Sequence, residues 1–263
     1  MPEPVREQTH SFTLVHGGLV HRIAKRLPFA GSNRFVLPAI IAGIVAFLPI
    51  VVLAGMQNVL YGNRVDLPLI ADWSVIVRFA IAIPLLILAE RTVDRWLSEA
   101  VELFRSEGLV SDTVRPEFDA ALQRLTRRLD SVFPELMLLA LAFASAWAGS
   151  ITSIGPMIST WRLPVPGEES SVTLAGQWLS LVSVPLFRFL MLRWFWRILL
   201  WTLFLYRVSR MNLVLVPTHP DGAAGLGFLG LAHTSFATLL VSLALTVGSR
   251  GVYWVLYAGG TLE

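Results

Sequence analysis

The sequence predicts an all-α protein, a polytopic α-helical membrane bundle with about five complete spans. Hydrophobic residues make up 55% of the chain and the mean hydropathy is +0.65, whereas soluble domains are about 45–50% apolar. These residues gather in runs of about 20 or more, the length that crosses a bilayer. The charges, which sum to a net +3, lie between the runs. They form no clustered basic patch, so we expect no nucleic-acid partner.

Five apolar segments are long enough to cross a bilayer, and a shorter apolar stretch follows the fifth. The five expected spans are 35–56, 73–89, 134–154, 175–206 and 226–247. The fourth is longer than one crossing requires. After "GSRG" the apolar stretch Val252 to Gly259 is too short to span, and on its own it predicts at most part of a helix.

These spans divide the chain into four regions, and the basic residues orient them. The regions are the tail 1–34, spans one and two at 35–89, a linking segment at 90–133, and 134–263 with a turn at 213–225. The tail and the linking segment are rich in arginine, whereas the loops on the opposite side offer only Arg64 and Arg162. Because basic loops remain on the cytoplasmic side, the N-terminus is predicted to be cytoplasmic.

The segment 90–133 carries two apolar stripes at helical spacing. One runs from Val93 to Phe104 and the other from Phe118 to Val132, with Gly108 and Pro116 between them as stop and restart signals. This pattern predicts a cytoplasmic amphipathic helical hairpin whose stripes pack on each other and on the bundle. The alternative is a surface that docks a protein partner or lies on the membrane.

Four arginines interrupt the apolar spans, and each costs at least about 2.5–3.5 kcal/mol near the bilayer centre on insertion scales. They are Arg78, Arg188, Arg193 and Arg197. At about 100° per residue, Arg193 and Arg197 share a helix face and Arg188 does not. We interpret Arg193 and Arg197 as interfacial anchors that contact lipid headgroups among tryptophans.

Two alternatives remain for these arginines. The first is internal pairing with Glu90, Asp94 or Glu135, and the second is an anion path. Arg78 is expected to snorkel or to pair with Asp72 or Asp66. Arg188, the deepest of the four, would face the protein interior if the chain transports a solute.

A second unusual feature is the stretch "LVPTHPDGAAGLGFLG" at Leu215 to Gly230. Pro220-Asp221-Gly222 favours a tight turn, and Asp221 is placed to cap the following helix. The small residues after it are typical of membrane helices that pack closely. Alternatively, exposed amides at a helix N-terminus attract anions. The ligand-binding residues would then be these five: His219, Asp221, Gly222, Gly225 and Gly227.

Catalytic and metal motifs are missing from the sequence. There is no cysteine, so thiol nucleophiles, thiolate metal ligands and disulfides are excluded. The glycines of the turn do not form a Walker loop, and neither a GxSxG elbow nor an HExxH pair occurs. We therefore predict no catalytic residue, no metal site and no cofactor.

Two motifs together resemble an uncharacterised family of bacterial polytopic membrane proteins. They are "RFAIAIPLLILAE" at Arg78 to Glu90 and "PTHPDGAAGLGFLG" at Pro217 to Gly230, the latter matching a PTHPDxAxGLGFL-type pattern. Gly222 stands where the family pattern has an arginine, and Ala224 where it has its first glycine. The resemblance implies a multi-pass protein of the bacterial inner membrane, with Val252 to Glu263 beginning a truncated sixth span. It implies no activity.

Together these features favour a non-enzymatic membrane protein, either a scaffold or a transport or channel component. Its expected partners are membrane lipids and a protein docked on 90–133, and the sequence does not specify an oligomeric state. The alternative is a membrane enzyme or receptor that holds a phosphate-bearing ligand at the turn around His219 and Asp221.

Overall fold

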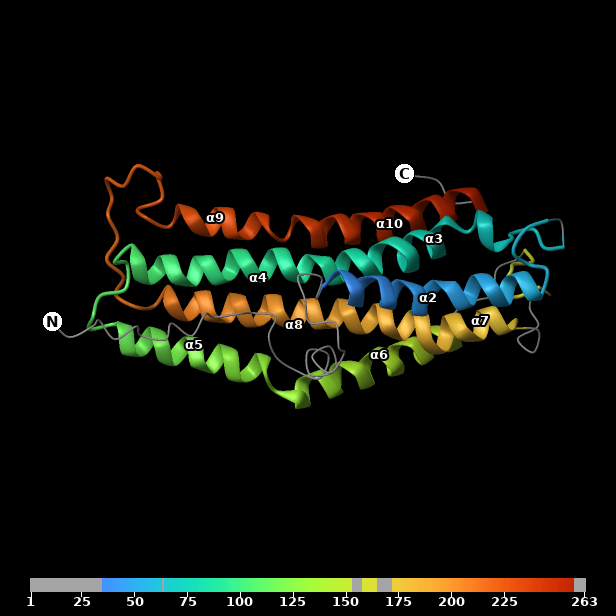
Figure 1. Ribbon diagram of the computed structural model, residues 1–263, viewed down its shortest axis with the longest axis horizontal. Coiled ribbons are helices and arrows are strands. Elements are labelled where there is room, and N and C mark those ends of the chain that lie inside the picture. Colours follow the sequence, from blue (N-terminus) through green and yellow to red (C-terminus); the bar gives the residue numbers. More distant parts are fainter. Residues whose placement is uncertain (1–34, 63, 153–157, 165–171, 258–263) are drawn as a thin grey trace.

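A computed structural model describes residues 35–62, 64–152, 158–164 and 172–257, and within these ranges the chain is all-α (Figure 1). The predicted tail 1–34 lies outside the described residues. Long helices run side by side along one axis. The main helices are α2 (Val36–Met56), α4 (Ile83–Ser106), α5 (Arg115–Leu129), α6 (Val132–Thr152), α8 (Val184–Val208), α9 (Gly227–Thr234) and α10 (Ala237–Tyr257).

The bundle has two halves, and α2 marks the boundary between them. Two composite helices, Trp73–Ser106 and Leu174–Val208, contain 34 and 35 residues, or about 50 Å each at 1.5 Å per residue. The hydrocarbon core is only about 30 Å thick, the length of α2. In Figure 1, α2 lies beside one half of these two composite helices, while α5 and α9 lie beside the other half. The first half is the membrane half, and the second projects beyond it.

The membrane prediction is confirmed, with altered boundaries. Four helices of the described chain are long and apolar enough to cross a membrane. A fifth is added if α5 and α6, which meet at a bend of 46°, count as one span. The expected second span ended at 89, but its helix continues without a break to Ser106. The first arm of the predicted hairpin is therefore the projecting end of a membrane helix.

The predicted boundaries of span five are wrong. Residues 226–247 are divided by a break after Thr234, and the membrane helix α10 begins at Ala237. The side chains of His233, Thr234 and Ser235 all contact carbonyls of the preceding turn, at 2.6 Å each. Such bonds compete with the helical backbone ladder and bend or end helices.

The expected break at "GSRG" is also wrong. α10 continues through Gly248, Ser249, Arg250 and Gly251 to Tyr257. The residues from Val252 to Tyr257, interpreted from sequence as the start of a sixth span, are thus the end of α10. The remainder, 258–263, lies outside the described residues.

Both composite helices contain a π-helical turn directly before a proline. The turn η2 (Val77–Ala82) links α3 (Trp73–Ile76) to α4 just before Pro84, and η4 (Leu179–Ser183) links α7 (Leu174–Trp178) to α8 just before Pro185. A proline cannot donate the i→i−4 bond, so the backbone ladder must change at that point. Such π-turns are frequent at functional sites.

The two π-turns pack against the same part of α2. A methyl group added at Gly43 would lie 3.0 Å from Pro84 Cγ, so the glycine lets Pro84 pack closely against α2. Three residues further along α2, the Ser183 hydroxyl donates to the Ala46 carbonyl at 2.6 Å. The middle of α2 is therefore the place where both irregular turns meet.

Helix α2 has its own proline, whose missing bond is replaced by a side chain. Pro49 lies inside α2 and cannot donate to the carbonyl of Val45, four residues before it. The indole Nε1 of Trp178, from α7, donates to this carbonyl at 3.1 Å. Each buried backbone acceptor needs a donor in lipid, and Trp178 supplies it.

The apolar stripes of the predicted hairpin are buried, as expected. Phe104 and Phe118, at 1% and 0% exposure, contact each other with ring centroids 5.7 Å apart. Phe118 also meets Phe204 of α8, and Phe104 meets Phe228 of α9. The stripes therefore form part of the core of the projecting half.

Candidate functional site: a buried ionic network and a group of arginines

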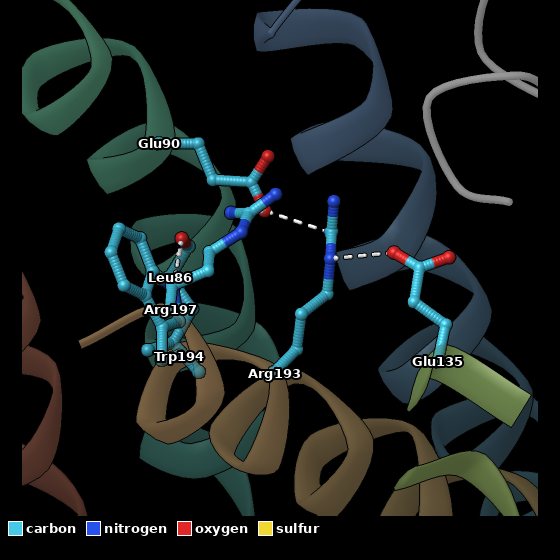
Figure 2. Close-up of polar contacts among 6 residues, drawn as sticks. All are labelled: Leu86, Glu90, Glu135, Arg193, Trp194 and Arg197. Atoms are coloured by element: carbon cyan, nitrogen blue, oxygen red, sulfur yellow. Dashed lines mark hydrogen bonds and ion pairs between the residues drawn. The ribbon is translucent and has the colours of Figure 1, made fainter. Parts of the chain in front are cut away.

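A buried ionic network joins the three helices α4, α6 and α8 (Figure 2). Arg193 and Arg197 extend from α8. The Nη1 atoms of both arginines lie 2.9 Å from Oε1 of Glu90 on α4. Arg193 Nε lies 3.4 Å from Oε1 of Glu135 on α6. One oxygen of Glu90 is therefore shared between two guanidinium groups.

The network is removed from lipid and from water. Arg193 and Arg197 are each 4% exposed, and Glu90 and Glu135 are each 7% exposed. Asp94, one turn beyond Glu90, is buried as well. Among the described residues, the contacts of the network join two guanidinium groups to two carboxylates. Burying an unpaired charge would cost several kcal/mol, about 3–5 when one partner of a buried pair is removed.

Hydrogen bonding within the network is incomplete. Arg193 Nη1 donates a well-formed hydrogen bond to Glu90. By contrast, Arg193 Nε and Arg197 Nη1 are within ion-pair distance of carboxylates but are not aligned to donate to them. Arg193 Nε and Arg197 Nη1 are therefore held to their carboxylates by charge more than by hydrogen-bond geometry.

Trp194 completes the site. Its indole Nε1 donates to the carbonyl of Leu86 at 3.0 Å, and its ring faces the guanidinium of Arg197, with Cζ 5.6 Å from the ring centroid. Trp194 therefore connects α8 to α4 and fixes the position of Arg197 (Figure 2).

The preferred interpretation of Arg193 and Arg197 as interfacial anchors is wrong. Their four-residue spacing does put them on one face, but this face is turned toward α4 and α6. The alternative of internal pairing with Glu90 and Glu135 describes the structure. On α8, lipid contact is left to outward-facing side chains such as Phe195 and Leu199, both about half exposed.

Arg78 and Arg188 are placed differently. Both are half-buried, Arg78 in η2 and Arg188 in α8. Within the described chain neither has a carboxylate in ion-pair range, so the expected pairing of Arg78 with Asp72 or Asp66 is wrong. The guanidinium of Arg78 instead lies over the rings of Phe79 and Phe187, at 5.8 and 5.7 Å from their centroids.

The acids proposed for Arg78 are engaged elsewhere. Asp72 caps α3 by accepting from the amide of Val75 and the hydroxyl of Ser74, and it also accepts from the indole of Trp161 at 3.0 Å. Asp66 accepts from Ser159. These bonds tie the loop 158–164 to the ends of the helices. Neither carboxylate is in ion-pair contact with Arg78.

The turn before α9 is organised around the carboxylate of Asp221. This carboxylate accepts from the amides of Ala223, Gly225 and Gly227, at 2.8, 3.1 and 2.8 Å. His219 Nδ1 lies 2.9 Å from the same group. Gly227 is the first residue of α9, and Leu226 holds the N-cap position without a side-chain bond, so Asp221 binds the first amide of this helix from outside the N-cap position. The amides that could attract an anionic ligand are therefore already occupied.

The glycines of this turn serve its geometry. Gly222 and Gly225 have positive φ, of 65° and 94°, which side chains rarely adopt. Ala224 also has a positive φ, of 56°. A methyl group at Gly227 would lie 2.9 Å from Cβ of Asp221, so Gly227 is required for the close approach of the cap.

Hydrogen bonding also sets the charge of Asp221. Partial desolvation raises the pKa of this carboxyl, but the amides of Ala223, Gly227 and Gly225 and the His219 ring together lower the pKa far below its ordinary value of 3.8. Asp221 is therefore ionised throughout the physiological range, and a negative group already fills the turn.

No group of three His, Asp or Glu residues in the described ranges is arranged to hold a metal ion. Comparison of the chain with protein-family models, with curated proteins and with solved structures found no match. The resemblance to a bacterial membrane family remains a prediction, and functional arguments depend on the geometry alone.

Sequence reasoning missed three parts of the site. Neither π-turn was expected, although Pro84 and Pro185 mark both. Arg250 was passed over because "GSRG" was interpreted as a break in the helix. The bond from Trp178 to Val45 joins residues 133 positions apart, and only Pro49, the proline in the interior of α2, signalled that a donor was needed there.

Proposed function

We propose that the protein is a non-enzymatic transport or channel component of the bacterial inner membrane, with its N-terminus in the cytoplasm. The buried ionic network of Glu90, Glu135, Arg193 and Arg197 carries this proposal. Ionisable side chains within membrane helices are costly, and they usually belong to solute pathways or to elements that move. The orientation follows from the arginine-rich segments.

The position and bonding of the network support a gate more than a fixed scaffold. The network ties α4, α6 and α8 together where the membrane half passes into the projecting half. A purely structural network gains most from complete hydrogen bonding. This one shares one carboxylate oxygen between two arginines and leaves two donors misaligned. Such a lock can exchange partners when helices shift.

The enzyme or receptor alternative has less support. It requires free amides at the turn before α9, whereas Asp221 accepts from three of them. A phosphate-bearing ligand would first have to displace this carboxylate.

Ion flux through reconstituted vesicles tests the proposal. Proteoliposomes carrying wild type, Glu90→Gln or the control Glu102→Gln would be given a potassium diffusion potential, and its decay followed with a voltage-sensitive dye. Glu102 is exposed on the same helix, so its variant matches the chemistry of the change without breaking the network. We expect Glu90→Gln to dissipate the potential faster than wild type, because the lock no longer holds α4 to α8.

Equal decay in all three preparations, indistinguishable from empty vesicles, would contradict a transport role and leave the scaffold. Folding of each variant would be checked by circular dichroism and size-exclusion chromatography before reconstitution.

A further inference from the structure

A shallow hollow in the projecting half combines arginines with apolar side chains. It lies between α5 and α8, which pack against each other. Among the residues that line it are Arg124, Leu125 and Arg128 of α5, and Leu203, Phe204 and Arg207 of α8. The three arginines are exposed or half-buried, whereas Leu125 and Phe204 are buried. The hollow therefore has a basic rim and an apolar floor.

The positive charge of this rim is not matched by the protein around it. Among the described residues, none of the three arginines is in ion-pair contact with a carboxylate, and no carboxylate lines the hollow. α8 contains neither Asp nor Glu, and Asp119 of α5 is paired with Arg105 at 2.6 Å. Arg124 and Arg128 are four residues apart, a spacing at which like charges on a helix repel each other. An anion in the hollow relieves this repulsion.

An exposed apolar track on α8 leads from the membrane half to the hollow. Phe195, Leu199 and Leu203 are 58%, 49% and 39% exposed, and their spacing of four residues places them along one side of the helix. Arg207 follows Leu203 at the same spacing. A row of large exposed apolar side chains marks a surface that another apolar group covers. The track and the rim together fit a molecule with an apolar tail and a negative head.

The hollow lies near the level at which the hydrocarbon core ends. Gly43 of α2 packs on Pro84. From this contact, the start of α2 and Glu90 are seven and six residues away in the same direction, about 9 to 11 Å at 1.5 Å per residue. Beyond the network, Leu203 follows Arg197 by six residues, about 9 Å. Headgroups add about 5–8 Å to each side of the hydrocarbon core, so the hollow is within reach of the headgroup layer.

We propose that this hollow binds the phosphate headgroup of an anionic phospholipid from the adjacent leaflet. Arg124, Arg128 and Arg207 hold the phosphate by charge-assisted hydrogen bonds, and an acyl chain covers the apolar track on α8. Basic pockets beside membrane helices recur as sites for anionic headgroups. The inference goes beyond the proposed function, because the site uses no residue of the ionic network.

Lipid binding to the full-length chain tests the site. Protein in neutral detergent would be titrated with dioleoylphosphatidylglycerol or with dioleoylphosphatidylcholine, and bound lipids would be counted by native mass spectrometry. Wild type is expected to bind one phosphatidylglycerol in preference to phosphatidylcholine. Arg207→Gln is expected to bind phosphatidylglycerol about 5-fold more weakly, and the double variant Arg124→Gln/Arg128→Gln about 25-fold, at about 5-fold for each basic residue near an anionic lipid.

Two further variants separate a built site from general attraction to charge. Arg127→Gln removes an exposed arginine of the same helix that does not line the hollow, and it is expected to bind phosphatidylglycerol like wild type. Leu203→Gln interrupts the apolar track and is expected to weaken the binding of both lipids. The arginine variants, by contrast, are expected to weaken phosphatidylglycerol binding alone.

Two results would overturn the proposal: equal phosphatidylglycerol binding by wild type and the arginine variants of the hollow, or an equal loss in Arg127→Gln. The same spectra count the chains. If Arg207→Gln dissociates a dimer and leaves the bound lipid unchanged, the hollow is a contact between two copies and the proposal is wrong. The measurement uses detergent without a gradient, so it does not depend on the flux through Glu90→Gln vesicles. Unfolding temperatures would verify that each variant is folded.

Discussion

Two groups of arginines lie inside this bundle, and they differ in how their charge is balanced. Arg193 and Arg197 meet Glu90 and Glu135 in a buried network with two charges of each sign. Arg78 and Arg188 are half-buried and have no carboxylate of the described residues in ion-pair range. The first group is thus paired with carboxylates of the chain, whereas Arg78 lies over the rings of Phe79 and Phe187. The two groups differ in how the cost of burying charge is offset.

Removing a carboxylate from the network should give the largest effect. Glu90→Ala would leave Arg193 and Arg197 buried with only Glu135 as a partner, and we expect a loss of about 3–5 kcal/mol in unfolding free energy. The unfolding temperature in detergent measures it. Glu102→Ala on the exposed face of the same helix should cost less than about 0.5 kcal/mol. Equal losses for the two variants would show that the network is not a stabilising lock.

Neutralising Arg78 should change the unfolding free energy in the opposite direction from removing Glu90. Arg78→Gln removes an unpaired charge, so we expect a change between zero and about 2 kcal/mol of added stability, part of its insertion cost. Arg193→Gln, which orphans buried carboxylates, should destabilise under the same conditions. If Arg78→Gln is as destabilising as Arg193→Gln, the two groups do not differ in the way described.

The carbonyl of Val45 in α2 allows the same comparison, between a polar group with its partner and without it, for an uncharged group. Trp178→Phe removes the donor to Val45 and should cost about 1–2 kcal/mol, the penalty of a carbonyl left without a hydrogen-bond partner inside the bilayer. In a Pro49→Ala background, residue 49 regains its own N–H, so the cost of Trp178→Phe should nearly vanish. A double-mutant cycle of thermal unfolding measures this coupling, and additive effects would contradict it.

The turn before α9 provides a satisfied carboxylate outside the membrane. Gly227→Ala would push against Asp221, whose Cβ and Oδ2 would lie 2.9 and 3.0 Å from the new methyl group, and we expect a loss of about 1 kcal/mol from the weakened cap. Gly230→Ala, in the same helix with open space around it, should instead stabilise by about 0.5–1 kcal/mol. Opposite signs in thermal unfolding are the expected result, and two gains would contradict the role of the cap.

The smallest effect concerns pH. Because folding lowers the pKa of Asp221, its contribution is fully present above the ordinary value of 3.8 and is lost as the pH falls toward the folded-state pKa. The difference in unfolding temperature between wild type and Asp221→Asn should therefore be greatest near neutral pH and shrink below about pH 4. A difference that does not change with pH would indicate that charge is unimportant at the turn.

The sequence predicted the parts of this fold that depend on local composition. Apolar runs located α2 and the two composite helices, and helical spacing identified the buried faces of α4 and α5. The end of α9 was missed because the polar residues His233, Thr234 and Ser235 were counted as part of a span. Their bonds to the preceding turn depend on side-chain geometry that hydropathy does not measure.

The ionic network was harder to predict from the sequence than the helices, for a physical reason. Arg193 and Glu90 are 103 residues apart, so their pairing depends on which helices become neighbours. Spacing placed Arg193 and Arg197 on one face of α8 but did not indicate whether that face meets lipid or protein. Asp221, by contrast, bonds only to amides within six residues of it, and such local contacts follow from turn chemistry.

The bond from Trp178 to Val45 also constrains how the protein is made. α2 is synthesised and reaches the bilayer well before α7, and until then the carbonyl of Val45 has neither the amide of Pro49 nor the indole to bond with. A newly inserted α2 therefore carries an open acceptor in its middle, which water or the insertion machinery must cover. The Val45 carbonyl gains its donor only when α7 packs against α2. The hydrogen bonding of α2 is therefore completed by a helix that is synthesised later.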